Sequence, residues 1–131
     1  PNTFTGNITL FNATNLLVGE EPNQQPKDSL TLYHNHLSMQ AGAYQNATWV
    51  VGTAKCGNEE GSQMGGQSVI VAPSGEIVAQ AVTVEDEAIT ARCDLDMGRI
   101  YKDTIFNFAQ HRRPEAYTLI TERAGVILPP Q

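Results

Sequence analysis

The chain has 131 residues, a net charge of -6 and 40% hydrophobic residues, a composition that fits one globular domain. Its acidic balance argues against nucleic acid as a partner, because nucleic-acid-binding proteins carry a basic face. No apolar run approaches the ~20 residues that span a bilayer, so we expect no membrane partner. Two cysteines and the lack of a visible signal peptide make a reducing cytoplasm the expected location.

The first half of the chain predicts a strand, a long loop, a helix and a second strand. Residues 7–12 have the character of a short strand, and residues 13–27 are a polar loop that contains prolines. A helix capped by Asp28 or Ser29 runs to about residue 46. Residues 48–55 form a buried strand, so the order strand–helix–strand predicts a parallel pair.

The predicted helix carries apolar side chains on two faces. Five of them recur at spacings of three and four and form one stripe: Leu30, Tyr33, Leu37, Ala41 and Tyr44. A second face adds Leu32, Met39 and Ala43. We expect such a helix to be covered twice, by its own sheet and by something else, for which a partner subunit is one candidate.

Residues 56–66 are predicted to form a glycine-rich loop. The two apolar runs that follow, residues 67–73 and 76–83, are separated by the turn Ser74-Gly75. This arrangement predicts a hairpin.

The last third of the chain predicts one more strand, a short helix and an irregular tail. Side chains of residues 87–95 alternate between two faces of a strand. Asp96 caps a short helix over residues 96–104, and the tail that follows is expected to wrap over a neighbouring surface. Taken together, the elements predict an α/β fold with both faces of the sheet covered.

Two cysteines are the candidate nucleophiles. Cys56 follows a strand, but a reactive thiolate needs a base or a helix N-terminus beside it, and the sequence predicts neither. Lys55 is adjacent, but neighbours on a strand point to opposite faces. Cys93 has the character of a core residue. We therefore expect both cysteines to be structural.

His34 and His36 stand two residues apart on the predicted helix. Residues at this spacing do not share a helical face, so we expect no metal ion between them. One of the two is expected to face the sheet as a hydrogen-bonding residue. Neither a metal nor a cofactor is expected, and no complete catalytic constellation is visible.

One segment, residues 30–57, closely resembles the N-carbamoyl-D-amino acid amidohydrolases of the nitrilase superfamily. The likeness is strongest over residues 38–46, SMQAGAYQN, where most of the superfamily has an Arg-Ala…Glu-Asn pattern. Three further segments resemble the superfamily's Gly-x-Ser…Pro-x-Gly hairpin, its next strand and its C-terminal Arg-Pro…Tyr segment: residues 65–81, 85–96 and 106–120.

The resemblance implies an α-β-β-α sandwich that hydrolyses the carbamoyl amide of a small N-carbamoyl amino acid through a Cys-Glu-Lys triad, without metal. Cysteine attacks the carbamoyl carbon, glutamate is the base, and lysine holds the oxyanion. Ammonia and CO2 leave, and a D-amino acid remains. The family places the triad upstream of the matched segments, so residues 1–131 resemble the C-terminal part of such an enzyme. No catalytic residue is expected in this chain, which should be inactive without the N-terminal half.

Two site residues and an interface are implied by the same resemblance. Asn12 resembles an asparagine that hydrogen-bonds the substrate carboxylate, and His34 matches a histidine that organises the pocket without touching the substrate. The long helix and the tail, residues 105–131, are implied to lie at a subunit interface. We therefore expect a homo-oligomer, either a dimer or a tetramer.

Two alternatives stay open. The chain could belong to another amidase of the superfamily or to an enzyme similar to β-ureidopropionase. It could also be a non-catalytic oligomerisation module.

Overall fold

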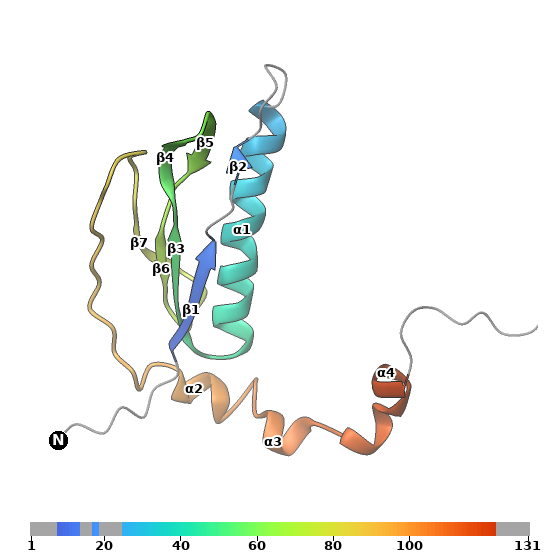
Figure 1. Ribbon diagram of the computed structural model, residues 1–131. Helices are drawn as coiled ribbons and strands as arrows, with labels where there is room; N and C mark the ends of the chain where they lie inside the picture. Colours follow the sequence, from blue (N-terminus) through green and yellow to red (C-terminus); the bar gives the residue numbers. More distant parts are fainter. Residues whose placement is uncertain (1–7, 14–16, 19–24, 123–131) are drawn as a thin grey trace, which may run out of the picture.

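The computed structural model describes residues 8–13, 17–18 and 25–122 of the chain (Figure 1). A four-stranded sheet has the order β1-β3-β6-β7, formed by β1 (Ile8–Ala13), β3 (Trp49–Ala54), β6 (Val69–Val71) and β7 (Ile77–Gln80). A three-stranded sheet has the order β2-β5-β4, formed by β2 (Leu17–Val18), β4 (Cys56–Glu59) and β5 (Ser62–Gly65).

One long helix, α1 (Gln25–Gln45), connects the first two strands of the larger sheet. Four short helices follow the sheets: α2 (Arg99–Lys102), α3 (Phe108–His111), the 3-10 helix η1 (Pro114–Ala116) and α4 (Thr118–Glu122). The predicted helices at residues 28–46 and 96–104 are both present. The first begins earlier than predicted, so Asp28 and Ser29 lie within it and the predicted cap is wrong. The second is shorter, and its N-cap is Gly98 rather than the predicted Asp96.

The predicted parallel pair and hairpin are both confirmed. Strands β1 and β3 pair in parallel, with Asn12 in register with Thr53. Strands β6 and β7 are antiparallel, and their turn is closed by the Gly75 amide, which donates to the Ala72 carbonyl at 2.8 Å. This arrangement of helix and strands is the predicted α/β fold.

Helix α1 covers one face of the four-stranded sheet through its second apolar face. Met39 and Ala43 are buried there against three valines of the sheet: Val50, Val69 and Val71. Gly52 of β3 lies directly beneath Met39, because a Cβ atom built on Gly52 would come within 2.2 Å of the Met39 sulfur. A side chain at position 52 would therefore displace the end of the Met39 side chain.

The opposite face of the sheet is covered by an extended segment, residues 88–97 (Figure 1). Alternate side chains of this segment pack against Trp49, Ile70 and Ala72: Ile89, Ala91, Cys93, Leu95 and Met97. The indole nitrogen of Trp49 donates to the Asp94 carbonyl at 2.8 Å, which attaches the segment to the sheet. The predicted alternation is confirmed, but the segment is not a strand of either sheet.

The prediction of a glycine-rich loop over residues 56–66 is wrong. Most of this segment is the hairpin of β4 and β5, whose four paired positions run from Cys56 opposite Gly65 to Glu59 opposite Ser62. Strand β5 also pairs with β2, so the hairpin holds the short segment that follows β1.

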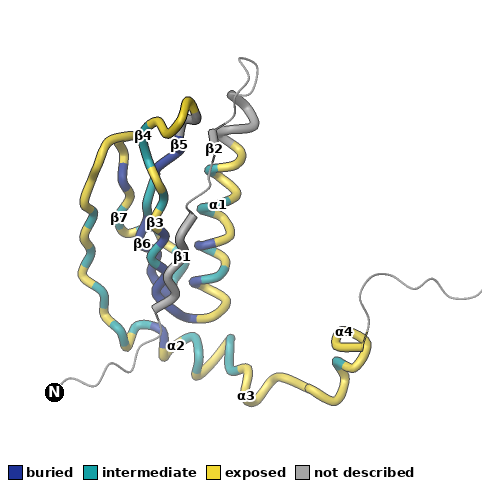
Figure 2. The backbone as a smooth tube through the Cα atoms, viewed as in Figure 1, coloured by how far each residue is buried: buried dark blue, intermediate teal, exposed yellow. Residues whose placement is uncertain are grey.

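All five apolar residues of the stripe on α1 are exposed, and Figure 2 shows exposed residues recurring along this helix. Tyr33 is 58% exposed and Leu37 is 47% exposed. At the end of the stripe, the Tyr44 ring contacts the rings of Tyr101 and Phe106, with centroids 5.6 and 4.9 Å away. In the described part of the chain, none of the helices combines the length and the apolar character that crossing a bilayer requires.

Candidate functional site

The carboxyl ends of β1 and β3 meet at one edge of the four-stranded sheet, because the two strands are parallel. This edge holds Asn12 and Thr53, which are in register, and Ala54, the last residue of β3. Strand β6 starts at the same edge, since it runs antiparallel to β3. In open α/β sheets, the carboxyl ends of the strands are where ligands bind.

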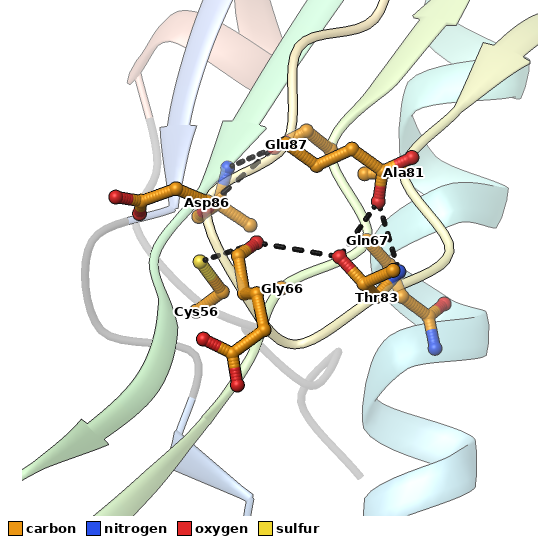
Figure 3. A pocket seen from close by; sticks show the side chains of 10 residues that line it. Cys56, Gly66, Gln67, Ala81, Thr83, Asp86 and Glu87 are labelled. Atoms are coloured by element: carbon orange, nitrogen blue, oxygen red, sulfur yellow. Dashed lines mark hydrogen bonds between the residues drawn. The ribbon is translucent and has the colours of Figure 1, made fainter.

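A polar hollow of about 220 Å³ lies at this edge (Figure 3). It opens between the base of the β4–β5 hairpin and the segment that follows β7. Its lining residues are Ala54, Cys56, Gly66, Gln67, Ser68, Ala81, Thr83, Glu85, Asp86 and Glu87. Three of them are carboxylates, so the hollow has an acidic rim.

The chain between β5 and β6, residues 66–68, forms one wall of the hollow. The Gly66 amide donates to the Lys55 carbonyl at 3.0 Å, and the Ser68 hydroxyl accepts a hydrogen bond from the Ala54 amide at 3.0 Å. Gly66 and Gln67 both have a left-handed backbone, with φ angles of 60° and 61°. This conformation is strained for a residue with a side chain, as at Gln67.

Cys56 lies in the hollow, but its surroundings do not activate a nucleophile. Its thiol donates to the Glu85 carbonyl at 3.3 Å, an oxygen that cannot accept a proton as a base would (Figure 3). Hydrogen bonds from the Thr83 amide, the Thr83 hydroxyl and the Val82 amide hold the pKa of the Glu87 carboxyl below its usual value. Glu87 is therefore a weakened base.

Lys55 also takes no part in a catalytic arrangement. Its ammonium group forms an ion pair with Glu59, on the strand that follows. Cys93 is half-buried on the face of the four-stranded sheet opposite α1, and its thiol contacts the Ala91 carbonyl at 3.8 Å. In residues 8–13, 17–18 and 25–122, no three His, Cys, Asp or Glu side chains converge as metal ligands would.

Of the two histidines, His36 faces the sheet. Its Nε2 atom lies 3.1 Å from the Gln67 carbonyl, and because a carbonyl only accepts, Nε2 carries the proton. His34 is exposed on the outer side of α1, where its ring contacts Tyr33 at a centroid distance of 5.7 Å. The expectation that one histidine makes a structural hydrogen bond is confirmed for His36.

The site residues carried over by resemblance stay predictions. Asn12 lies in β1, near its carboxyl end, but its side chain is outside the part of the chain that the structure describes. The described contacts of His34 all lie within α1. Its ring contacts Tyr33, and its carbonyl accepts a hydrogen bond from the Ser38 hydroxyl at 2.8 Å.

Sequence reasoning missed Gln67 and Ser68 as residues of this edge. Residues 66–68 entered the sequence analysis only as the Gly-x-Ser part of a segment that resembles the superfamily's hairpin. A useful signal was present, since a glycine pair before a polar residue and an apolar run is typical of a bend where a strand begins.

Comparison with known proteins gives matches to one family. The family model described as carbon-nitrogen hydrolase matches residues 11–103. A curated protein of Staphylococcus lugdunensis, described as the hydrolase in the agr operon, is 35% identical over 68 residues. The match covers 52% of this chain and 29% of that protein, so the chain spans less than a third of this relative's length.

Two solved structures share the fold. The crystal structure of a carbon-nitrogen hydrolase from Helicobacter pylori G27 has a TM-score of 0.69 at 20% identity, covering 88% of this chain and 41% of that chain. The NitFhit protein of C. elegans has a TM-score of 0.62 at 26% identity, covering 86% of this chain and 25% of that chain. Less than half of each of these proteins is represented in the present chain.

Proposed function

Since the chain belongs to the carbon-nitrogen hydrolase family, we propose that it is the C-terminal part of an N-carbamoyl-D-amino acid amidohydrolase. The complete enzyme converts an N-carbamoyl-D-amino acid and water into a D-amino acid, ammonia and CO2. Its Cys-Glu-Lys triad lies upstream of these 131 residues, which supply the carboxyl edge of the sheet and part of the substrate pocket.

The observation that carries the proposal is the sequence of residues 38–46 and its place in the fold. Met39 fills the space above Gly52, and the Gln40 amide donates to the Gly75 carbonyl at 2.9 Å. Asn46 closes the helix, with its side-chain amide 2.9 Å from the Gly42 carbonyl. The run whose sequence resembles the N-carbamoyl branch therefore lies where the helix is attached to the sheet, and it is the sequence of this run that supports the branch.

The environments of the two cysteines support a triad outside this chain. Among the described residues, the hydrogen bonds of the Cys56 and Cys93 thiols go to backbone carbonyls, of Glu85 and Ala91, and not to a general base or a lysine. Lys55 is held by Glu59. A hydrolase of this family therefore needs residues from elsewhere to form the acyl intermediate.

The same proposal includes self-association. The exposed stripe on α1 is apolar along its length, and the tail carries further exposed apolar side chains, among them Ile105 and Leu119. Large apolar patches that stay exposed are typical of subunit interfaces. We propose that these two surfaces, the stripe and the tail, form the contacts of a homo-oligomer.

A substrate panel on the complete hydrolase tests the proposed chemistry. Ammonia release is measured with N-carbamoyl-D-amino acids, their L-enantiomers, N-carbamoyl-β-alanine and simple aliphatic amides. The proposal predicts the highest kcat/KM for N-carbamoyl-D-amino acids. Preference for N-carbamoyl-β-alanine or a simple amide would place the enzyme in another branch of the family. A protein that assembles normally but hydrolyses none of them would be an oligomerisation module.

A further inference from the structure

The β4–β5 hairpin leaves the plane of the larger sheet at a sharp bend. Only Lys55 separates β3 from β4, and residues 66–68 separate β5 from β6. Strands β3 and β6 belong to the four-stranded sheet, while β4 and β5 belong to the three-stranded one. The same two stretches of chain therefore pass from one sheet into the other at this bend.

Hydrogen bonds from three directions hold the bend. The Ser68 hydroxyl takes the place of a backbone carbonyl in accepting from the Ala54 amide, and the Ser68 carbonyl accepts from the Ala81 amide at 2.8 Å. From the side of α1, His36 donates to the Gln67 carbonyl at 3.1 Å. This bond fixes the one residue of the bend that is strained without being a glycine.

The hairpin in turn holds the chain that follows β1. Strand β5 pairs with β2, with Leu17 opposite Met64 and Val18 opposite Gln63. Strand β2 begins four positions after Ala13, the last residue of β1. The orientation of the hairpin therefore determines the position of β2.

We propose that His36 is a positioning residue of the hydrolase. By fixing the Gln67 carbonyl, it holds residues 66–68, one wall of the polar hollow, and sets the direction of the β4–β5 hairpin at the edge where the substrate is proposed to bind. This inference rests on the proposed function. It gives His36 an indirect role in substrate binding, since His36 itself touches no substrate.

The test compares three variants of the complete hydrolase with an N-carbamoyl-D-amino acid as substrate. His36→Leu removes the donor, and His36→Gln keeps an amide donor of similar reach. Gln40→Leu is the matched control, because Gln40 also joins α1 to the carbonyl of a left-handed residue, Gly75, but beyond the opposite end of β6. We expect His36→Leu to raise KM about tenfold, the effect of weakening substrate binding by about one hydrogen bond, while kcat stays unchanged. His36→Gln should restore the KM, and Gln40→Leu should change only the melting temperature.

Three results would overturn the proposal: a normal KM in His36→Leu, an equally raised KM in His36→Gln, or the same rise in Gln40→Leu. If the wild-type enzyme acts on no N-carbamoyl amino acid, the proposed function fails and a second measurement decides on His36. Amide hydrogen exchange over residues 56–65 should then be faster in His36→Leu than in Gln40→Leu. Equal exchange rates in these two variants would rule out the positioning role.

Discussion

Single residues decide how α1 meets the sheet. Met39 occupies the space above Gly52, where a Cβ atom would displace its sulfur. Gln40 and His36 reach backbone carbonyls on either side of β6, at Gly75 and Gln67. The helix is thus fixed by the packing of Met39 on the sheet and by two hydrogen bonds to the chain just before and just after β6.

The Glu87 carboxyl should make the stability of the protein depend on pH. Three hydrogen bonds to one carboxylate oxygen close the turn over residues 82–87, each at 2.9 Å from Val82 or Thr83. They lower the pKa of the Glu87 carboxyl in the folded state. The stabilisation is therefore complete above the pKa of the unfolded state and is lost as pH falls through the lower, folded value.

Melting curves against pH check this expectation. The wild-type protein should exceed Glu87→Gln in melting temperature at neutral pH, and the difference should shrink steadily in acid. Glu85→Gln, two residues away, serves as the control and should follow the wild type. A Glu87→Gln curve parallel to that of the wild type at every pH would contradict the account of the turn.

The sequence predicted that one of the two histidines faces the sheet, but not that it is His36. The spacing of His34 and His36 showed that the two side chains point to different faces of α1. It could not show which of them faces the sheet, because the helix is apolar on two sides. The partner of His36, the Gln67 carbonyl, is 31 residues away and belongs to a strained backbone that no residue type announces.

At the scale of elements, the hairpin of β4 and β5 was the main error of the sequence analysis. Its strands contain polar residues and glycines, so they lack the apolar alternation from which strands are recognised. Backbone pairing and a tight turn form it instead, with Glu60 and Gly61 at φ angles of 51° and 88°. The segment 88–97 is the opposite case. Its apolar side chains alternate as in a strand, but it packs across the face of the sheet and is a strand of neither sheet.

The exposed stripe on α1 makes a prediction for this element. Leu37→Glu places a charge at the centre of the stripe, so we expect the complete hydrolase to sediment as a smaller species. Ser38→Glu is the matched control, because Ser38 is exposed on the same helix but lies off the stripe. Analytical ultracentrifugation measures both. If Leu37→Glu keeps the wild-type assembly, or if Ser38→Glu dissociates it equally, the stripe is not the interface.

For the whole molecule, the α/β order and the parallel pair followed from the sequence because each long apolar run formed one element. The family followed from the motifs around residues 38–46, and the family match over residues 11–103 confirms it. The branch is proposed from residues 38–46, whereas the substrate depends on side chains near the reacting atoms. Most of the length of the relatives lies outside the matched part, so this chain holds too few of those side chains to predict the substrate.

The central claim is that these residues belong to a carbon-nitrogen hydrolase whose nucleophile lies outside them. The double variant Cys56→Ala, Cys93→Ala of the complete enzyme tests it directly, with kcat for an N-carbamoyl-D-amino acid as the measurement. We predict a kcat equal to that of the wild type, with an unchanged assembly state as the control. Loss of the nucleophile itself would lower kcat by a factor on the order of 10⁶, and such a loss in the folded double variant would contradict the claim.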